Sequence, residues 1–305
     1  MSAVLALAGA LIYGAADFVG GLTSRRSGTY AVVVGSQLAG LLLLLAVLPL
    51  LPSEALTWPA LGWGAVAGLG GGAGVALLYR GLAIGRMSVV APITAIGAAT
   101  VPVVVGLVGG ERPSATALLG VVLALIAVVL VSLSPSPSAS SEHGRAEVFA
   151  ATGGVPRGWR RPGLPEAIGA GLAFGAFFVL LDRAGDEALR AQAAEGGSAT
   201  LWPLVGARSS IVLIALAALA TRSPLKPAPG TWPVIALVGT LDMGANVLYM
   251  TARSRGSLAL VAVLISLYPA STVLLARVVL RERLGRLQLG GLACAALGVV
   301  LIAPG

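Results

Sequence analysis

Three charged side chains lie inside long apolar stretches of the sequence: Asp17, Arg208 and Asp242. A charge at membrane depth costs about 2.5–3.5 kcal/mol or more, so such residues usually face a polar interior or a solute pathway. Tyr13 is four residues before Asp17 and Asn246 is four residues after Asp242, so each pair shares one helix face. These residues are candidates for binding a solute. A simpler interpretation is that an aspartate pairs with Arg208 and fixes the packing of the helices.

Hydroxyl groups and prolines supply the other candidate residues. A proline inside a helix frees a backbone carbonyl one turn upstream, and a hydroxyl or a water molecule can then occupy that carbonyl. The functional interpretation is a bent gating helix whose hydroxyls face the solute, and the alternative is an ordinary kink of a membrane helix. The candidates are Thr94 between Pro92 and Pro102, Tyr249 on the polar stripe of Asp242 and Asn246, and Ser266, Tyr268 and Ser271 around Pro269.

The chain around these candidates is too apolar for a soluble protein. Apolar residues make up 57% of it and charged residues 10%, and the mean hydropathy is +0.95, whereas soluble proteins carry about 25% charged residues. A soluble enzyme and a disordered chain are therefore excluded, and the lone Cys294 excludes a disulfide framework. The net charge of +8 comes from basic residues dispersed between apolar runs, so no nucleic-acid surface is expected.

Apolar runs long enough to cross a bilayer occur ten times. A membrane helix needs about 20 predominantly apolar residues, and Trp-Pro pairs mark the start of several runs, where an indole ring suits the headgroup layer. The predicted fold class is therefore an all-α polytopic membrane protein. The ten predicted transmembrane helices are residues 3–22, 30–51, 60–83, 89–108, 115–133, 165–181, 201–220, 232–251, 258–280 and 287–303.

The sequence contains an internal duplication. A Ser/Pro/Arg-rich linker over 135–165 separates a half at 1–134 from a half at 166–305, with five predicted helices in each. Glu111 stands nine residues before Gly120, and Glu282 stands nine residues before Gly291, at an offset of 171 residues. Five is odd, so the two halves must cross the membrane in opposite directions. Inverted repeats of this kind occur in secondary transporters, with the solute site near the midplane where the repeats meet.

Small and aromatic residues give two packing predictions. Glycines recur every four residues from Gly64 to Gly72, a spacing that favours close contact between membrane helices. Phe174, Phe177 and Phe178 lie within five residues of one another. They form either an aromatic wall of a cavity or ordinary packing against lipid and core.

The two loop motifs resemble those of EamA-type transporters of the drug/metabolite transporter superfamily. The matching segments are Gly110-Glu111-Arg112-Pro113-Ser114 with Leu119-Gly120, and Arg281-Glu282-Arg283-Leu284 with Gln288-Leu289-Gly290. The resemblance implies that the first, third and fourth helices of each half line a central cavity, and that both termini are cytoplasmic. The distribution of Arg and Lys over the loops favours the opposite orientation.

The expected function is secondary transport of a small metabolite by alternating access. The solute would be amino-acid-like or another small organic molecule, exported across the inner (cytoplasmic) membrane, and Asp17 or Asp242 would support proton coupling. No P-loop is found, and no cofactor, metal or enzyme activity is expected; the lone His143 lies in the linker. The alternatives are a drug or cation/proton antiporter of the same superfamily, an intramembrane aspartyl protease, and a membrane scaffold or sensor.

Overall fold

A computed structural model describes residues 1–50, 57–84, 87–132, 163–195, 201–268, 270–272, 275 and 285–302. All regular secondary structure in these ranges is helical. The predicted all-α membrane fold is therefore confirmed. The helices are α1 (Ser2–Ser27), α2 (Thr29–Val47), the short 3-10 helix η1 (Leu48–Leu50), α3 (Trp58–Ile84), α4 (Met87–Val108), α5 (Ala115–Ser132), α7 (Leu164–Glu195), α8 (Trp202–Ala207), α9 (Ser210–Ala220), α10 (Trp232–Arg253), α11 (Leu258–Ile265) and α13 (Arg286–Ile302).

Ten apolar segments in the described chain correspond to the ten predicted transmembrane helices. Six are long and apolar enough to cross a membrane, and four shorter apolar helices complete the set. The six are Ser2–Ser24, Thr29–Leu50, Trp58–Leu82, Leu164–Ala191, Trp202–Ala220 and Trp232–Arg253; the four are Ile93–Val108, Ala115–Leu130, Leu258–Thr272 and Leu289–Gly298.

Tryptophan-proline pairs begin three of the helices, as the sequence indicates. Trp58, Trp202 and Trp232 are the first residues of α3, α8 and α10, and a proline follows each one. Proline suits the first turn of a helix because the N–H it lacks has no partner there. The side chains of Trp58 and Trp232 are exposed, where an indole ring can lie in the headgroup layer.

Two predicted spans differ from the structure. The span at 201–220 is interrupted, because Arg208 and Ser209 form a turn between α8 and α9. The amide of Ser209 bonds the carbonyl of Gly206 there, in place of the regular helical bond. The span at 165–181 is too short: α7 continues past Leu181 to Glu195, because the chain stays helical after its fully apolar run ends.

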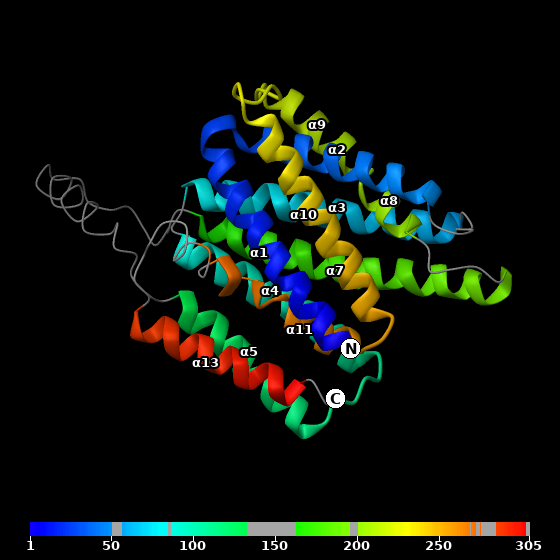
Figure 1. Cartoon of the computed structure of the whole chain (residues 1–305), viewed down its shortest axis with the longest axis vertical. Helices are drawn as coiled ribbons and strands as arrows, with labels where there is room; N and C mark the ends of the chain where they lie inside the picture. The colour runs from blue at the N-terminus through cyan, green and yellow to red at the C-terminus, as the bar shows by residue number, and fades with distance from the viewer. Residues whose placement is uncertain are drawn as a thin grey trace, which may run out of the picture.

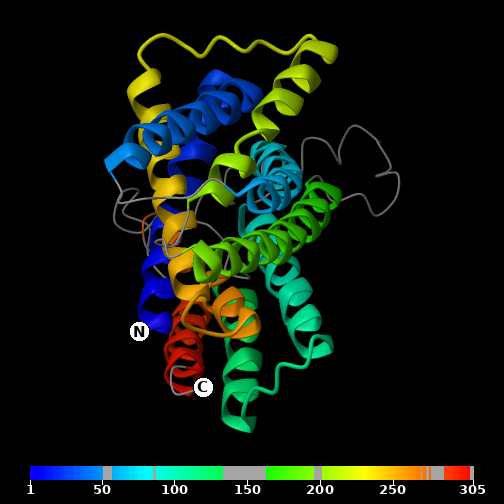
Figure 2. The same cartoon turned by 90° about the vertical axis from the view of Figure 1, so that its right-hand side faces the viewer.

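Helices from the two halves interleave in a two-fold pattern. α1 packs on α10 and α11, and α7 packs on the equivalent α3 and α4; α2 packs on α10, and α8 on α3. α5 and α13 pack on each other and lie together at one end of the long axis, while α2 and α9 lie toward the other end (Figures 1 and 2). Each of these contacts that a helix of one half makes is matched by a contact of the equivalent helix of the other half. The chain therefore folds as two inverted five-helix repeats.

Backbone contacts reproduce the repeat residue by residue. A Cβ atom at Gly68 would collide with the carbonyl of Ala207, and one at Gly239 would collide with the carbonyl of Ser36. Both members of the second pair are related to those of the first by 171 positions. The close contact predicted for the glycines from Gly64 to Gly72 is thus present, since Gly64 also meets the carbonyl of Pro203. Small residues let these backbones approach closely.

The outer surface is apolar on the helices at both ends of the long axis. Large exposed side chains on α5, α9 and α13 include Leu119, Val122, Leu216, Leu219 and Val300. Contiguous apolar surface of this kind marks a membrane interface. Polar groups are concentrated between the repeats, where the candidate site lies.

Candidate functional site

A cavity lies between the two repeats, midway along the helices that surround it. It encloses about 660 Å³ of empty space, part of which is open to the outside. Helices of both repeats line it, including the second helix of the first repeat and α8. The lining residues are Tyr13, Asp17, Gln37, Gly68, Gly71, Gly72, Val75, Ala98, Phe174, Phe177, Phe178, Leu204, Ala207, Arg208, Asp242, Asn246, Ile265 and Tyr268.

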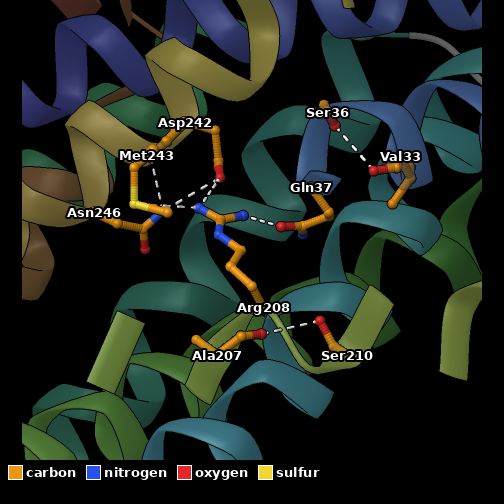
Figure 3. A network of polar contacts seen from close by, with 9 residues as sticks. All are labelled: Val33, Ser36, Gln37, Ala207, Arg208, Ser210, Asp242, Met243 and Asn246. Atoms are coloured by element: carbon orange, nitrogen blue, oxygen red, sulfur yellow. Dashed lines mark hydrogen bonds and ion pairs between the residues drawn. The ribbon is translucent and has the colours of Figure 1, made fainter. Parts of the chain in front are cut away.

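An arginine-centred network forms one wall of the cavity (Figure 3). The Arg208 guanidinium donates through Nη1 to Oε1 of Gln37 and through Nη2 to Oδ2 of Asp242, at 2.7 Å in the second case. Asn246 donates to the backbone carbonyl of Asp242 at 2.8 Å. The turn between α8 and α9 places Arg208 here. Asp242 therefore pairs with Arg208, as the packing interpretation expects, and also lines the cavity, as the binding interpretation expects.

The cavity also carries a carboxylate that is not paired. Asp17 lines the cavity, and no described residue forms a hydrogen bond or an ion pair with it. The buried hydroxyls of Tyr13 and Tyr268, and Oδ1 of Asn246, lack hydrogen-bond partners among the described residues. Buried polar atoms are normally satisfied, so each of these unpaired groups calls for an explanation such as a bound solute or water.

Aromatic rings form another wall. Phe177 and Phe178 have ring centroids 5.3 Å apart, and Phe178 makes an edge contact with Tyr13 at 6.4 Å. Tyr13-Gly14-Ala15 of α1 matches Phe174-Gly175-Ala176 of α7. Four residues after the matched aromatic residues stand Asp17 in α1 and Phe178 in α7. Of the two interpretations of the phenylalanines, the structure favours the aromatic wall, and it makes the cavity acidic on one side and apolar on the other.

Two successive contacts fasten α7 to α10 beside the cavity. The Tyr249 hydroxyl donates to the backbone carbonyl of Phe178 at 3.0 Å, and one turn further along both helices Arg253 forms an ion pair with Asp182. Each contact joins residues 71 positions apart. We call these four residues the α7–α10 clamp. It lies on the side at which α1 begins, because Gly256, just after α10, lies against Ser2.

The remaining sequence-predicted residues lie outside the cavity lining, and their hydroxyls donate to backbone carbonyls. Thr94 donates to the carbonyl of Ala167 at 3.2 Å, and Ser271 donates to the carbonyl of Ala10 at 3.1 Å. Ser266 bonds within its own helix. Tyr249 belongs to the clamp, behind Phe178. The hydroxyls of Thr94, Ser271 and Tyr249 are thus engaged in contacts between segments of the chain.

Two of the three candidate prolines lie in helix α4. Pro102 is a buried residue of α4. Pro92 lies in the same helix, which runs unbroken from Met87 to Val108. Pro269 lies outside the described residues, so the bent gating helix remains a prediction there.

Sequence reasoning missed Gln37 and the position of Glu111. Gln37 is a buried amide in the second predicted span, and an offset of 171 from Arg208 points to it. Glu111, in the repeated loop motif, accepts hydrogen bonds from the backbone amides of Leu258 and Ala259 at 2.8 and 3.1 Å. A carboxylate at a helix N-terminus satisfies amides that lack a helical partner. The first repeat thus fixes α11 of the second.

The side chains that line the cavity are suited to binding a solute. Asp242 is engaged by Arg208, so its carboxylate does not form the free pair with Asp17 that an aspartyl protease requires. Among the described residues, no group of three His, Cys, Asp or Glu side chains gathers to hold a metal ion. What the cavity offers is an unpaired carboxylate, hydroxyls, an amide oxygen and aromatic faces.

Comparisons with known proteins agree with this arrangement. The fold is similar to that in a crystal structure of a protein with 16% sequence identity, over 98% of this chain and 95% of that chain, with a TM-score of 0.64. No curated protein matches the sequence. The family model described as the EamA-like transporter family matches residues 1–133 and 161–303, nearly the whole chain. The chain therefore belongs to the EamA-like transporter family, and it is a multi-pass membrane transporter.

Proposed function

We propose that the protein is a secondary transporter that moves a small organic solute, amino-acid-like or of similar size, out of the cell across the inner membrane by alternating access. The observation that carries the proposal is the cavity between the two repeats, which holds unpaired polar groups. Inverted repeats permit two similar packings of the same halves, one open to each side. We propose residues 1–134 and 166–305 as the two units, with 135–165 as the linker.

The two packings would differ in whether the α7–α10 clamp is closed or open. In this structure α7 and α10 are fastened on the side at which α1 begins. In the equivalent place of the other repeat, Tyr79 of α3 lies against Gly20 of α1. No ion pair of described residues accompanies Tyr79 there. We propose that solute exchange requires the clamp to open while the Tyr79 contact closes more tightly.

Asp17 is the proposed coupling residue. A carboxylate without a counter-ion at membrane depth is costly, and either a proton or a cationic solute removes that cost. Asp242 already has Arg208 as its counter-ion. A drug or cation/proton antiporter of the same superfamily is therefore the second candidate, and the unpaired Asp17 is the observation that favours it.

Flux measurements test the proposal. Proteoliposomes containing the protein, loaded with extracts of small metabolites, should release a subset of them faster than protein-free vesicles. Flux should depend on a pH gradient, and Asp17→Asn should abolish that dependence while Asp242→Asn retains part of it. A chain that moves no solute in any gradient contradicts the transporter assignment. If both variants keep full flux and full pH dependence, proton coupling through these residues fails.

A further inference from the structure

We infer that the solute of this cavity carries a net positive charge: a primary amine or guanidinium compound with a compact aromatic or aliphatic body, rather than a zwitterionic amino acid or an anion. The inference rests on the proposed function and names the class of solute for the same site.

The charges that line the cavity leave one negative charge uncompensated. Three charged residues line it among those described: Asp17, Arg208 and Asp242. Arg208 and Asp242 form an ion pair at 2.7 Å and compensate each other. Asp17 remains. Since a lone charge is expensive at this depth, either a proton or a bound monocation neutralises the cavity, and the monocation is the solute that we infer.

The unsatisfied polar atoms point to the same chemistry. The guanidinium of Arg208 donates from its two terminal nitrogens to Gln37 and Asp242, so its charge is already compensated within the protein. The Asp17 carboxylate that lines the cavity and the unpartnered Oδ1 of Asn246 only accept hydrogen bonds. A protonated amine brings three donors and no acceptor. The unpartnered phenol hydroxyls of Tyr13 and Tyr268 can accept as well as donate.

The aromatic wall suits the rest of such a molecule. Tyr13, Phe177 and Phe178 present ring edges and faces beside Asp17. An aromatic face attracts a cation by about 0.5–2 kcal/mol and packs an apolar body. At the matched positions, the two repeats place Asp17 on one side and Phe178 on the other. The cavity is therefore arranged for a ligand with a cationic head and an apolar body.

An anion or a zwitterion finds no uncompensated cation for its carboxylate, because the charge of Arg208 is paired with Asp242. A full ion pair with Arg208 would require it to leave Asp242, which would then remain unpaired in the membrane. Separating a buried ion pair costs about 3–5 kcal/mol. We therefore expect phenylalanine to bind more weakly than 2-phenylethylamine, which has the same phenylethyl body, because of this cost and not because of size.

Thermal unfolding of the purified full chain in detergent, followed by tryptophan fluorescence, tests the inference with four compounds of one shape. The probes are 2-phenylethylamine as cation, 2-phenylethanol as neutral compound, 3-phenylpropionate as anion and phenylalanine as zwitterion. We expect the amine to raise Tm at millimolar concentration while the other three leave it unchanged. Asp17→Asn should weaken amine binding at least tenfold, and Asp17→Glu should restore much of it. Glu187→Gln, which removes a half-buried carboxylate of α7 that pairs with Arg190 outside the cavity lining, is the matched control and should bind normally.

Equal shifts by all four compounds, no shift by the amine, or an unchanged amine shift in Asp17→Asn would each overturn the inference. A shift by phenylalanine as large as that by the amine would overturn it too. Flux in proteoliposomes is measured separately from binding. Transport of the anion or zwitterion alone would leave the transporter assignment standing and reject the cationic solute. Amine binding that depends on Asp17 without flux in proteoliposomes would reject transport and leave the binding site.

Discussion

Gln37 and Arg208 occupy equivalent positions in the two repeats, 171 residues apart, and are hydrogen-bonded to each other. In a two-fold arrangement, a contact between equivalent residues must lie on the axis that relates the halves. The axis therefore passes through this wall of the cavity. Any rearrangement that exchanges the shapes of the two repeats leaves the Gln37–Arg208 contact in place, so the network around Arg208 is expected to act as the fixed point of the transport cycle.

The Arg208–Asp242 pair is predicted to stabilise the fold as a unit. Only 6% of the Arg208 side chain is exposed, so removing its partner strands a buried charge at a cost of about 3 kcal/mol. Asp242→Asn and Arg208→Gln should each lower Tm in detergent. The double variant should be less destabilised than the sum of the two, with a coupling of about 1–3 kcal/mol. Strictly additive effects would show that the two side chains do not interact.

The contact between α3 and α8 is predicted to require glycine. A Cβ atom at Gly68 would collide with the backbone carbonyl of Ala207, whereas one at Gly62 of the same helix meets nothing within 4 Å. Gly68→Ala should cost about 2 kcal/mol or more because backbones must separate, and Gly62→Ala should be neutral or gain up to about 1 kcal/mol. Thermal unfolding of the two variants side by side measures the difference. Similar Tm values for both would refute the close packing.

The loop carboxylate Glu111 is predicted to hold α11 in position. Two amides at the start of α11 bond to it, and loss of a cap of this kind costs about 1 kcal/mol. Glu111→Ala should lower Tm and reduce transport, because Ile265 at the far end of α11 and Tyr268 just beyond it line the cavity. Arg112→Ala, at the exposed neighbouring position, is the control. A Glu111 variant with native stability would show that the cap has no structural role.

The α7–α10 clamp is predicted to set the balance between the two open states. Asp182→Asn removes the ion pair to Arg253 while leaving the Tyr249–Phe178 contact. With Val75→Cys as a cavity reporter in a Cys294→Ala background, labelling by a membrane-impermeant thiol reagent from the clamp side should rise several-fold. Glu187→Gln should leave the labelling unchanged. A decrease in clamp-side labelling would contradict the role of the clamp as a closed gate.

The overall arrangement could be predicted because it follows from periodic, additive features of the sequence. Apolar length marked the ten spans, and the offset of 171 between Glu111 and Glu282 marked the repeat. The same offset leads from Arg208 to Gln37, so the partner of Arg208 was also present in the sequence, in the one amide of the second span.

The pairing inside the site could not be predicted, since it depends on which faces meet. Asp17 and Asp242 look alike in sequence, each a lone carboxylate in an apolar run with a polar neighbour one turn away. The turn at Arg208 and Ser209 decides between them, because it aims the guanidinium at Asp242 and leaves Asp17 unpaired. Hydropathy alone does not show this turn, since the run from 201 to 220 is otherwise apolar. For the same reason, Ser266 and Ser271 were candidates for the cavity but bond to backbone carbonyls.

Two-sided accessibility of the cavity is the most direct test of alternating access. Val75→Cys in the Cys294→Ala background places a single thiol in the cavity lining. It should be labelled by a membrane-impermeant reagent in both right-side-out and inside-out vesicles, and 2-phenylethylamine should protect it from both sides. Labelling from one side only, in every solute and ion gradient, would contradict alternating access.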